Sequence, residues 1–235
     1  FAYNYPVLSS IISIIILFFE ATYINRMVII NKLSNSITLY PGLIFIILSS
    51  ISPEFFILSD IQIARFFLIL GVTYLNYSYR QRNSVRNVYN AGLWFGFSCI
   101  LYPPMLILMI FFYIGFTTLR RFLSVESTRY LIGVITPMLL LAAYTVYTED
   151  FYNFIDVQFS DGFGLIQNMG FERWGNIMAY GPLLLFVLFS IVGYTQYISK
   201  KIIPSQKMIS IQFWLMAFIG IVALFTHDLS ELHFL

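Results

Sequence analysis

Long apolar runs separated by short polar segments make up most of this sequence. The runs that stand out are Leu8–Tyr23, Ile37–Ile51, Ile61–Tyr77, Val88–Tyr102, Met105–Leu119, Tyr130–Tyr147, Ile177–Ile198 and Met208–Thr226. A helix needs about 20 mostly apolar residues to cross a bilayer, and fewer where flanking side chains reach the interface. The pattern therefore predicts an all-α protein, a polytopic transmembrane helix bundle of about eight spans.

The composition agrees with this pattern. Of the 235 residues, 59% are hydrophobic and 10% are charged, with a mean hydropathy of +0.81. A soluble domain carries roughly 25% charged residues, so this chain has too few polar groups to cover a water-exposed surface. We therefore expect no soluble domain, and a single transmembrane domain over residues 1–235. The formal net charge of +2 is too small to indicate a nucleic-acid partner.

Basic and acidic segments alternate between the runs. Eleven of the thirteen Lys and Arg residues lie at residues 26–36, 78–88, 120–129 and 199–207. The intervening segments are acidic or, at Tyr102-Pro103-Pro104, uncharged. Because Lys and Arg are retained on the cytoplasmic side during insertion, the four basic segments are predicted to be cytoplasmic loops.

The longest segment between runs, residues 148–176, is predicted to be extracytoplasmic. Its residues Phe151, Phe154, Ile155 and Phe159 recur at near-helical spacing. This pattern predicts an amphipathic helix lying at the outer interface, ending near Ser160-Asp161-Gly162.

Arg65 is the one basic residue that enters a run from its acidic side. A charge inside a bilayer costs about 3 kcal/mol on insertion scales, so a partner is expected, and Asp60 and Glu54 are the nearest acids. One interpretation is an interfacial salt bridge. The alternative is an extracytoplasmic site that binds a phosphate or carboxylate, with Glu54 and Asp60 as its acidic groups, because the arginine fork is bidentate.

The remaining charges allow similar alternatives. Arg80, Arg82 and Arg86 are interpreted as a topological anchor, or alternatively as a site for an anionic lipid head group or a phosphate. Glu20, near the end of the first run, is interpreted as a structural residue that could pair with Arg26.

Familiar catalytic and metal-binding motifs are missing from the sequence. It has no GxSxG, Walker or CxxC pattern, and the single cysteine, Cys99, cannot form an internal disulfide. The cluster His227, Asp228, Glu231 and His233 resembles a metal site, but His233 does not share the helical face of His227 and Glu231. A structural zinc site needs four ligands at regular spacing, so we predict no metal and no cofactor.

Four stretches resemble an uncharacterised family of polytopic inner-membrane proteins of the Bacteroidota. These are Tyr23-Ile24-Asn25-Arg26, YPGLIFIILSSISPE, ARFFLILGVTYL and VYNAGLWFGFSCILYPPMLILMIFFY. The resemblance covers most of the chain and implies a bacterial inner-membrane location. It also implies a cell-envelope role, since the family is often found in organisms that glide or use type IX secretion. Members usually have a further span at each end, so we expect the native protein to continue beyond this sequence.

The same region is similar, more weakly, to the C-type-fold polyprenyl-phosphate-sugar glycosyltransferases. Ala91-Gly92-Leu93, Gly96 and Pro103 match the pattern AGLxxGxxxLxxP of those enzymes. Their catalytic carboxylate lies in the first large outer loop, a region that here would precede Phe1 or is missing, so the resemblance supplies no catalytic base. Glu54, in a later loop, would only stand in for it.

Two functions from different classes follow. The first is a non-catalytic subunit or scaffold of a cell-envelope complex, with the bilayer and other membrane subunits as partners. The second is a polyprenyl-phosphate-linked glycosyltransferase, or a protein that binds such a lipid carrier, using Arg65 and the outer acids. A transporter is a weaker third, since it predicts helices broken at mid-membrane and only Pro137 lies centrally in a run. An enzyme would bring Arg65 and a carboxylate together in an outer pocket, whereas a scaffold would present an apolar flank.

Overall fold

The computed structural model describes residues 6–34, 37–50, 58–80, 85–119, 124–148, 151–156 and 174–222. The helices are α1 (Pro6–Ile30), α2 (Tyr40–Ser49), α3 (Asp60–Arg80), α4 (Val85–Leu101), the 3₁₀ helix η2 (Pro103–Ile107), α5 (Leu108–Leu119), α6 (Ser124–Tyr147), α7 (Phe151–Ile155), α8 (Trp174–Ser199) and α9 (Ile203–Val222). No strand occurs within these ranges, so the prediction of an all-α fold is confirmed. Each apolar run of the sequence overlaps a helix.

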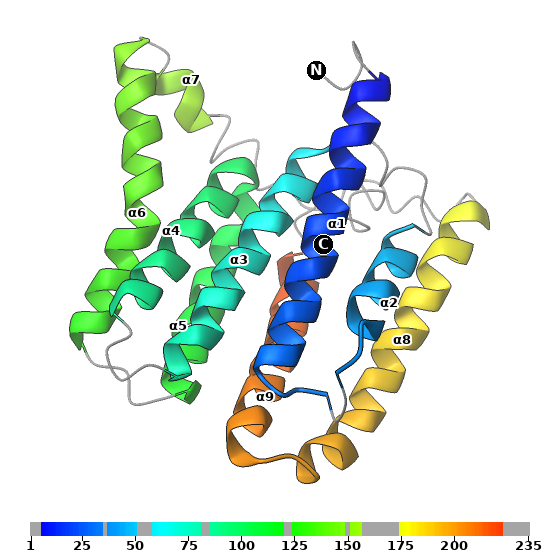
Figure 1. Cartoon of the computed structure of the whole chain (residues 1–235). Helices are drawn as coiled ribbons and strands as arrows, with labels where there is room; N and C mark the ends of the chain where they lie inside the picture. Colours follow the sequence, from blue (N-terminus) through cyan, green and yellow to red (C-terminus); the bar gives the residue numbers. More distant parts are fainter. Residues whose placement is uncertain are drawn as a thin grey trace.

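The long helices lie side by side and alternate in direction along the chain (Figure 1). As a result, the last turns of α1, α3, α5 and α8 and the first turns of α2, α4, α6 and α9 come to the same end of the bundle, while α6 leads to α7 at the other end. The described residues of the four basic segments lie in or beside these turns. Among the described acidic residues, Glu126 lies at this end, whereas Asp60 and Asp156 lie at the other.

Within the described ranges, three helices are long and apolar enough to cross a membrane. They cover Val7–Ile30, Val125–Tyr147 and Ile203–Val222. Two further apolar helices, Tyr40–Ser49 and Pro103–Thr118, are shorter. At 1.5 Å per residue, the 25 residues of α1 extend for about 38 Å, more than the roughly 30 Å of a bilayer's hydrocarbon core.

Small residues bring α4 and α6 into close contact. A Cβ atom added to Gly92 would lie 2.3 Å from the backbone oxygen of Tyr130, and one added to Gly96 would lie 2.5 Å from that of Val134. On the facing helix, a Cβ on Gly133 would lie 2.4 Å from the oxygen of Tyr89. Close approach of helix backbones at a GxxxG sequence is a common mode of packing in membranes.

A cluster of buried aromatic rings fills the space between α4, α5 and α6. Its members are Phe95, Phe111, Phe112, Phe116 and Tyr130, all at most 1% exposed. Neighbouring ring centroids lie between 4.8 and 6.4 Å apart, within the range of favourable aromatic pairs. The cluster thus joins α4, α5 and α6, with three of its five rings on α5.

Helix α1 has an apolar outer face and a partly polar inner face. Ser9, Ser13 and Glu20 are buried, at spacings of four and seven residues that place them on one face. The exposed side chains of the opposite face include Ile11, Ile14, Ile15, Phe18 and Phe19. A helix on the surface of a soluble protein shows the reverse arrangement, so this face of α1 is suited to apolar surroundings.

Two details differ from the sequence analysis. The first helix continues to Ile30, beyond the end of its apolar run at Tyr23, and therefore includes both Glu20 and Arg26. The helix expected in the long segment is seen as the five-residue α7, which ends at Ile155. Phe159 and the predicted stop at residues 160–162 lie outside the described residues.

Candidate functional site

The two charges nearest the middle of the bundle form a buried ion pair. Arg65 of α3 donates from Nε to Oε1 of Glu20 at 3.0 Å and from Nη2 to Oε2 at 2.7 Å. The side chain of Glu20 is 0% exposed and that of Arg65 is 7% exposed. The guanidinium carbon also lies 5.1 Å from the ring centroid of Phe45 on α2. Both carboxylate oxygens are thus bound by one arginine fork, the strongest arrangement for such a pair.

Hydrogen bonds between α1 and α3 hold the two charges in register. The Ser13 hydroxyl donates to Gln62 Oε1 at 2.9 Å, and Gln62 Nε2 donates to the backbone oxygen of Ser13 at 3.1 Å. One turn earlier, the backbone N–H of Leu58 donates to Ser9 Oγ at 3.0 Å. Because α1 and α3 run in the same direction (Figure 1), these contacts set Glu20 opposite Arg65.

Among the described residues, Arg65 pairs with Glu20, an acid that the sequence analysis did not propose as its partner. Asp60 is exposed at the first residue of α3, and Glu54 lies outside the described residues. Glu20 in turn does not bond Arg26, whose side chain is exposed. The expectation relied on closeness along the chain, whereas the real partners are 45 residues apart and meet only through helix packing.

A signal for this pair was present in the sequence. Glu20 and Arg65 are the only charged residues inside the eight apolar runs, and their charges are opposite. Since isolated charges within a bilayer are costly, two opposite charges in separate runs are expected to meet.

The other candidate arginines lie apart from this pair. Arg80 ends α3, fifteen residues beyond Arg65, and therefore about 22 Å away along the helix. Arg86 is exposed in the first turn of α4, and Arg82 lies outside the described ranges. The described part of the chain contains no group of three potential metal ligands, while His227, Asp228, Glu231 and His233 fall outside it.

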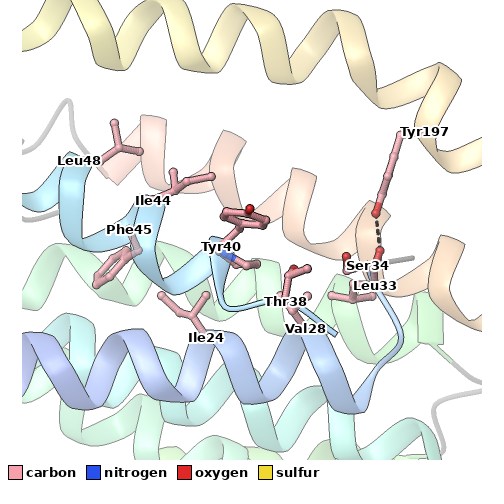
Figure 2. Close-up of a pocket in the computed structure, with 11 residues that line it drawn as sticks. Ile24, Val28, Leu33, Ser34, Thr38, Tyr40, Ile44, Phe45, Leu48 and Tyr197 are labelled. Carbon is pink, nitrogen blue, oxygen red and sulfur yellow. Dashed lines mark hydrogen bonds between the residues drawn. The ribbon is translucent and has the colours of Figure 1, made fainter. Parts of the chain in front are cut away.

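Two hollows lie beside the ion pair. A cavity of about 250 Å³ is lined by Arg65, Gln212 and otherwise apolar side chains of α1, α2, α3, α9 and η2. A larger groove of about 890 Å³ opens between α1, α2 and α8 (Figure 2). Ile24 and Phe45 line both hollows, so these two side chains form the boundary between them.

Helix α2 is fixed against α1 by a side chain from its neighbour. The Oδ1 atom of Asn25 accepts a 2.8 Å hydrogen bond from the backbone N–H of Gly42, in the first turn of α2. This N–H has no partner within its own helix, so Asn25 acts as a cap supplied by α1. A Cβ at position 42 would lie 2.3 Å from Asn25 Nδ2, so only glycine fits here without a shift.

Comparison with family models, curated proteins and solved structures found no match to this chain.

Proposed function

We propose that this chain is a multi-pass protein of the bacterial inner membrane that serves as a non-catalytic subunit or scaffold of a cell-envelope complex. In this proposal the bundle crosses the bilayer about eight times, has no soluble domain, and carries its four basic segments on the cytoplasmic side. Its partners are the bilayer and other membrane subunits.

The observation that carries the proposal is the exposure of two apolar helices on opposite flanks of the bundle (Figure 1). All side-chain positions from 187 to 193 of α8 are exposed, which covers every face of the helix. In the second half of α6, the exposed large hydrophobic side chains are Leu139, Leu140, Tyr144, Val146 and Tyr147. A helix that is apolar all round requires an apolar environment on all sides. Lipid can supply it, but helices that stand away from their own bundle are also suited to pack against another subunit.

The ion pair favours this proposal over the lipid-carrier alternative. A phosphate site needs an arginine whose charge and fork are open to the ligand. The charge of Arg65 is balanced by Glu20, one face of its guanidinium lies near Phe45, and Arg65 is the one charged side chain among the described residues that line the cavity beside it. Arg65 therefore acts as a structural link between α1 and α3.

The test is purification of the tagged full chain from its native membrane in a mild detergent, followed by mass spectrometry of bound proteins and lipids. We expect a stoichiometric membrane-protein partner. Replacing Phe189 and Val192 of α8 with alanine should release that partner, because their exposed side chains are available to it. The matched control replaces Ile15 and Phe18 on the outer face of α1 and should retain it.

Two outcomes would contradict the proposal. One is a chain that purifies without any partner protein. The other is a chain that retains a polyprenyl-phosphate lipid in stoichiometric amount, which would support the lipid-carrier alternative.

A further inference from the structure

The groove between α1, α2 and α8 is lined by apolar residues along its length and by hydroxyl-bearing residues at one end. Ile44, Phe45 and Leu48 of α2 line it opposite Ile24 and Val28 of α1 (Figure 2). From Tyr40 to Leu48 it follows about 12 Å of helix axis, less than half of a bilayer's hydrocarbon core. The hydroxyl-bearing residues Ser34, Thr38 and Tyr197 line its other end, nearest the α8–α9 connection.

Lysines neighbour the residues that line this end of the groove. The Nζ atom of Lys201 lies 4.8 Å from the ring centroid of Tyr197, in a cation–π contact. Because Tyr197 lines the groove, this contact places the positive charge of Lys201 near the end of the groove. Lys200 is exposed next to it, and Lys32, also exposed, directly precedes the lining residue Leu33. The sequence has no Asp or Glu between residues 21 and 53 or between 174 and 226, so α2, α8, α9 and the end of α1 carry no acidic residue.

The walls of the groove are held together by hydrogen bonds between distant segments. The Tyr197 hydroxyl of α8 donates to the backbone oxygen of Leu33. Ser205 of α9 donates from Oγ to the backbone oxygen of Asn31 at 3.2 Å. Together with the Asn25–Gly42 hydrogen bond, these contacts fix the positions of the helices that form the groove.

We propose that this groove binds an anionic glycerophospholipid of the bilayer. One acyl chain lies along Ile44, Phe45 and Leu48, and the phosphate lies at Lys200 and Lys201. The inference rests on the proposed membrane location, and two features of the groove identify the ligand. An apolar channel with cations at one end matches an amphiphile with an apolar tail and an anionic head, and basic pockets between helices on the cytoplasmic side recognise anionic head groups.

The experiment uses the full chain, purified in mild detergent and stripped of lipid by detergent exchange. Native mass spectrometry then measures binding of phosphatidylglycerol and of phosphatidylcholine with the same acyl chains. We expect phosphatidylglycerol to bind at least about tenfold more tightly, since each lysine near a membrane surface contributes roughly fivefold. The variant Lys200→Gln/Lys201→Gln should bind the two lipids equally.

Two further variants test the role of the lysines and the role of the apolar groove separately. Arg86→Gln/Arg129→Gln removes two positive charges from α4 and α6, at the same end of the bundle but away from the groove, and should keep the preference. Ile44→Trp places a larger side chain in the groove and should weaken the binding of both lipids. Thermal unfolding verifies that each variant is folded, and Ile44→Phe replaces the tryptophan variant if that one is not.

Three results would overturn the inference: equal binding of both lipids by the unaltered chain, an undiminished preference in the double lysine variant, or displacement of phosphatidylglycerol by an equimolar polyprenyl phosphate. Alkaline carbonate extraction shows whether the chain is integral to the membrane, and so distinguishes failure of the lipid-binding inference from failure of the proposed membrane location. A chain that stays in the membrane pellet but shows no lipid preference contradicts only the groove, whereas a chain released to the supernatant contradicts the membrane location itself.

Discussion

At the scale of single residues, Glu20 and Arg65 depend on each other. Each would be an uncompensated charge in the interior of the bundle without its partner. Removing one member of a buried pair is far more costly than removing both, because the remaining charge is left without water and without a counter-charge. The pair therefore links α1 to α3 specifically, since any other alignment of the two helices would leave two separate buried charges.

Glu20→Gln is expected to lower the free energy of unfolding by about 3–5 kcal/mol, because it leaves Arg65 buried without a counter-charge. Glu20→Gln/Arg65→Gln should recover most of that loss. The measurement is a double-mutant cycle from unfolding of the purified chain in mild detergent. The control is Arg26→Gln, an exposed charge on the same helix, which should change the stability by no more than about 0.5 kcal/mol. Equal costs for Glu20→Gln and Arg26→Gln would contradict the structural role of the pair.

At the scale of helices, the contact between α4 and α6 depends on residues without side chains. Gly92 and Gly96 lie one turn apart on α4 and face backbone oxygens of α6. Even a methyl group at either position would overlap an oxygen atom of the neighbouring backbone, which cannot move away as a flexible side chain could. These glycines thus set the distance between α4 and α6, two of the three helices that carry the aromatic cluster.

Gly92→Ala and Gly96→Ala are each expected to destabilise the chain by about 1–3 kcal/mol, the usual cost of overpacking. Gly220→Ala on α9 provides the control, since a Cβ there has no neighbour within 4 Å. It should leave stability unchanged or raise it by up to about 1 kcal/mol, because alanine favours a helix over glycine. Thermal unfolding in detergent compares the three variants, and a Gly92→Ala variant as stable as Gly220→Ala would contradict the close packing of α4 on α6.

At the scale of the whole molecule, the two ends of the bundle differ in charge. The described residues of the four basic segments lie in or beside helix turns at one end, and the retention of Lys and Arg during insertion would leave that end in the cytoplasm. Helix α7 lies at the opposite end (Figure 1) and is therefore expected outside the cytoplasm.

The proposed orientation can be measured with a membrane-impermeant maleimide on intact cells. Tyr152→Cys on α7, where the native side chain is 84% exposed, should be labelled in intact cells. Lys200→Cys at the α8–α9 connection should be labelled only after the membrane is permeabilised. The unaltered chain is the control, since its one cysteine, Cys99, is 1% exposed and should react little in either condition. The opposite labelling pattern would contradict the proposed orientation and indicate the reverse one.

The sequence alone was enough to predict the helices, the apolar character of the chain and the alternation of charge between helix connections. These depend on runs of neighbouring residues, and each apolar run predicts a helix without reference to the rest of the chain. It also singled out Arg65 as a buried charge that needs an acid, but it placed that acid in the adjacent segment at Asp60 or Glu54.

Only the tertiary structure identified Glu20 as the partner, Gly42 as the backbone group bound by Asn25, and the groove beside them. The physical reason is the same in each case. Which side chains meet depends on how each helix is rotated and shifted against its neighbours, and that is decided by packing between residues 17 to 174 positions apart along the chain.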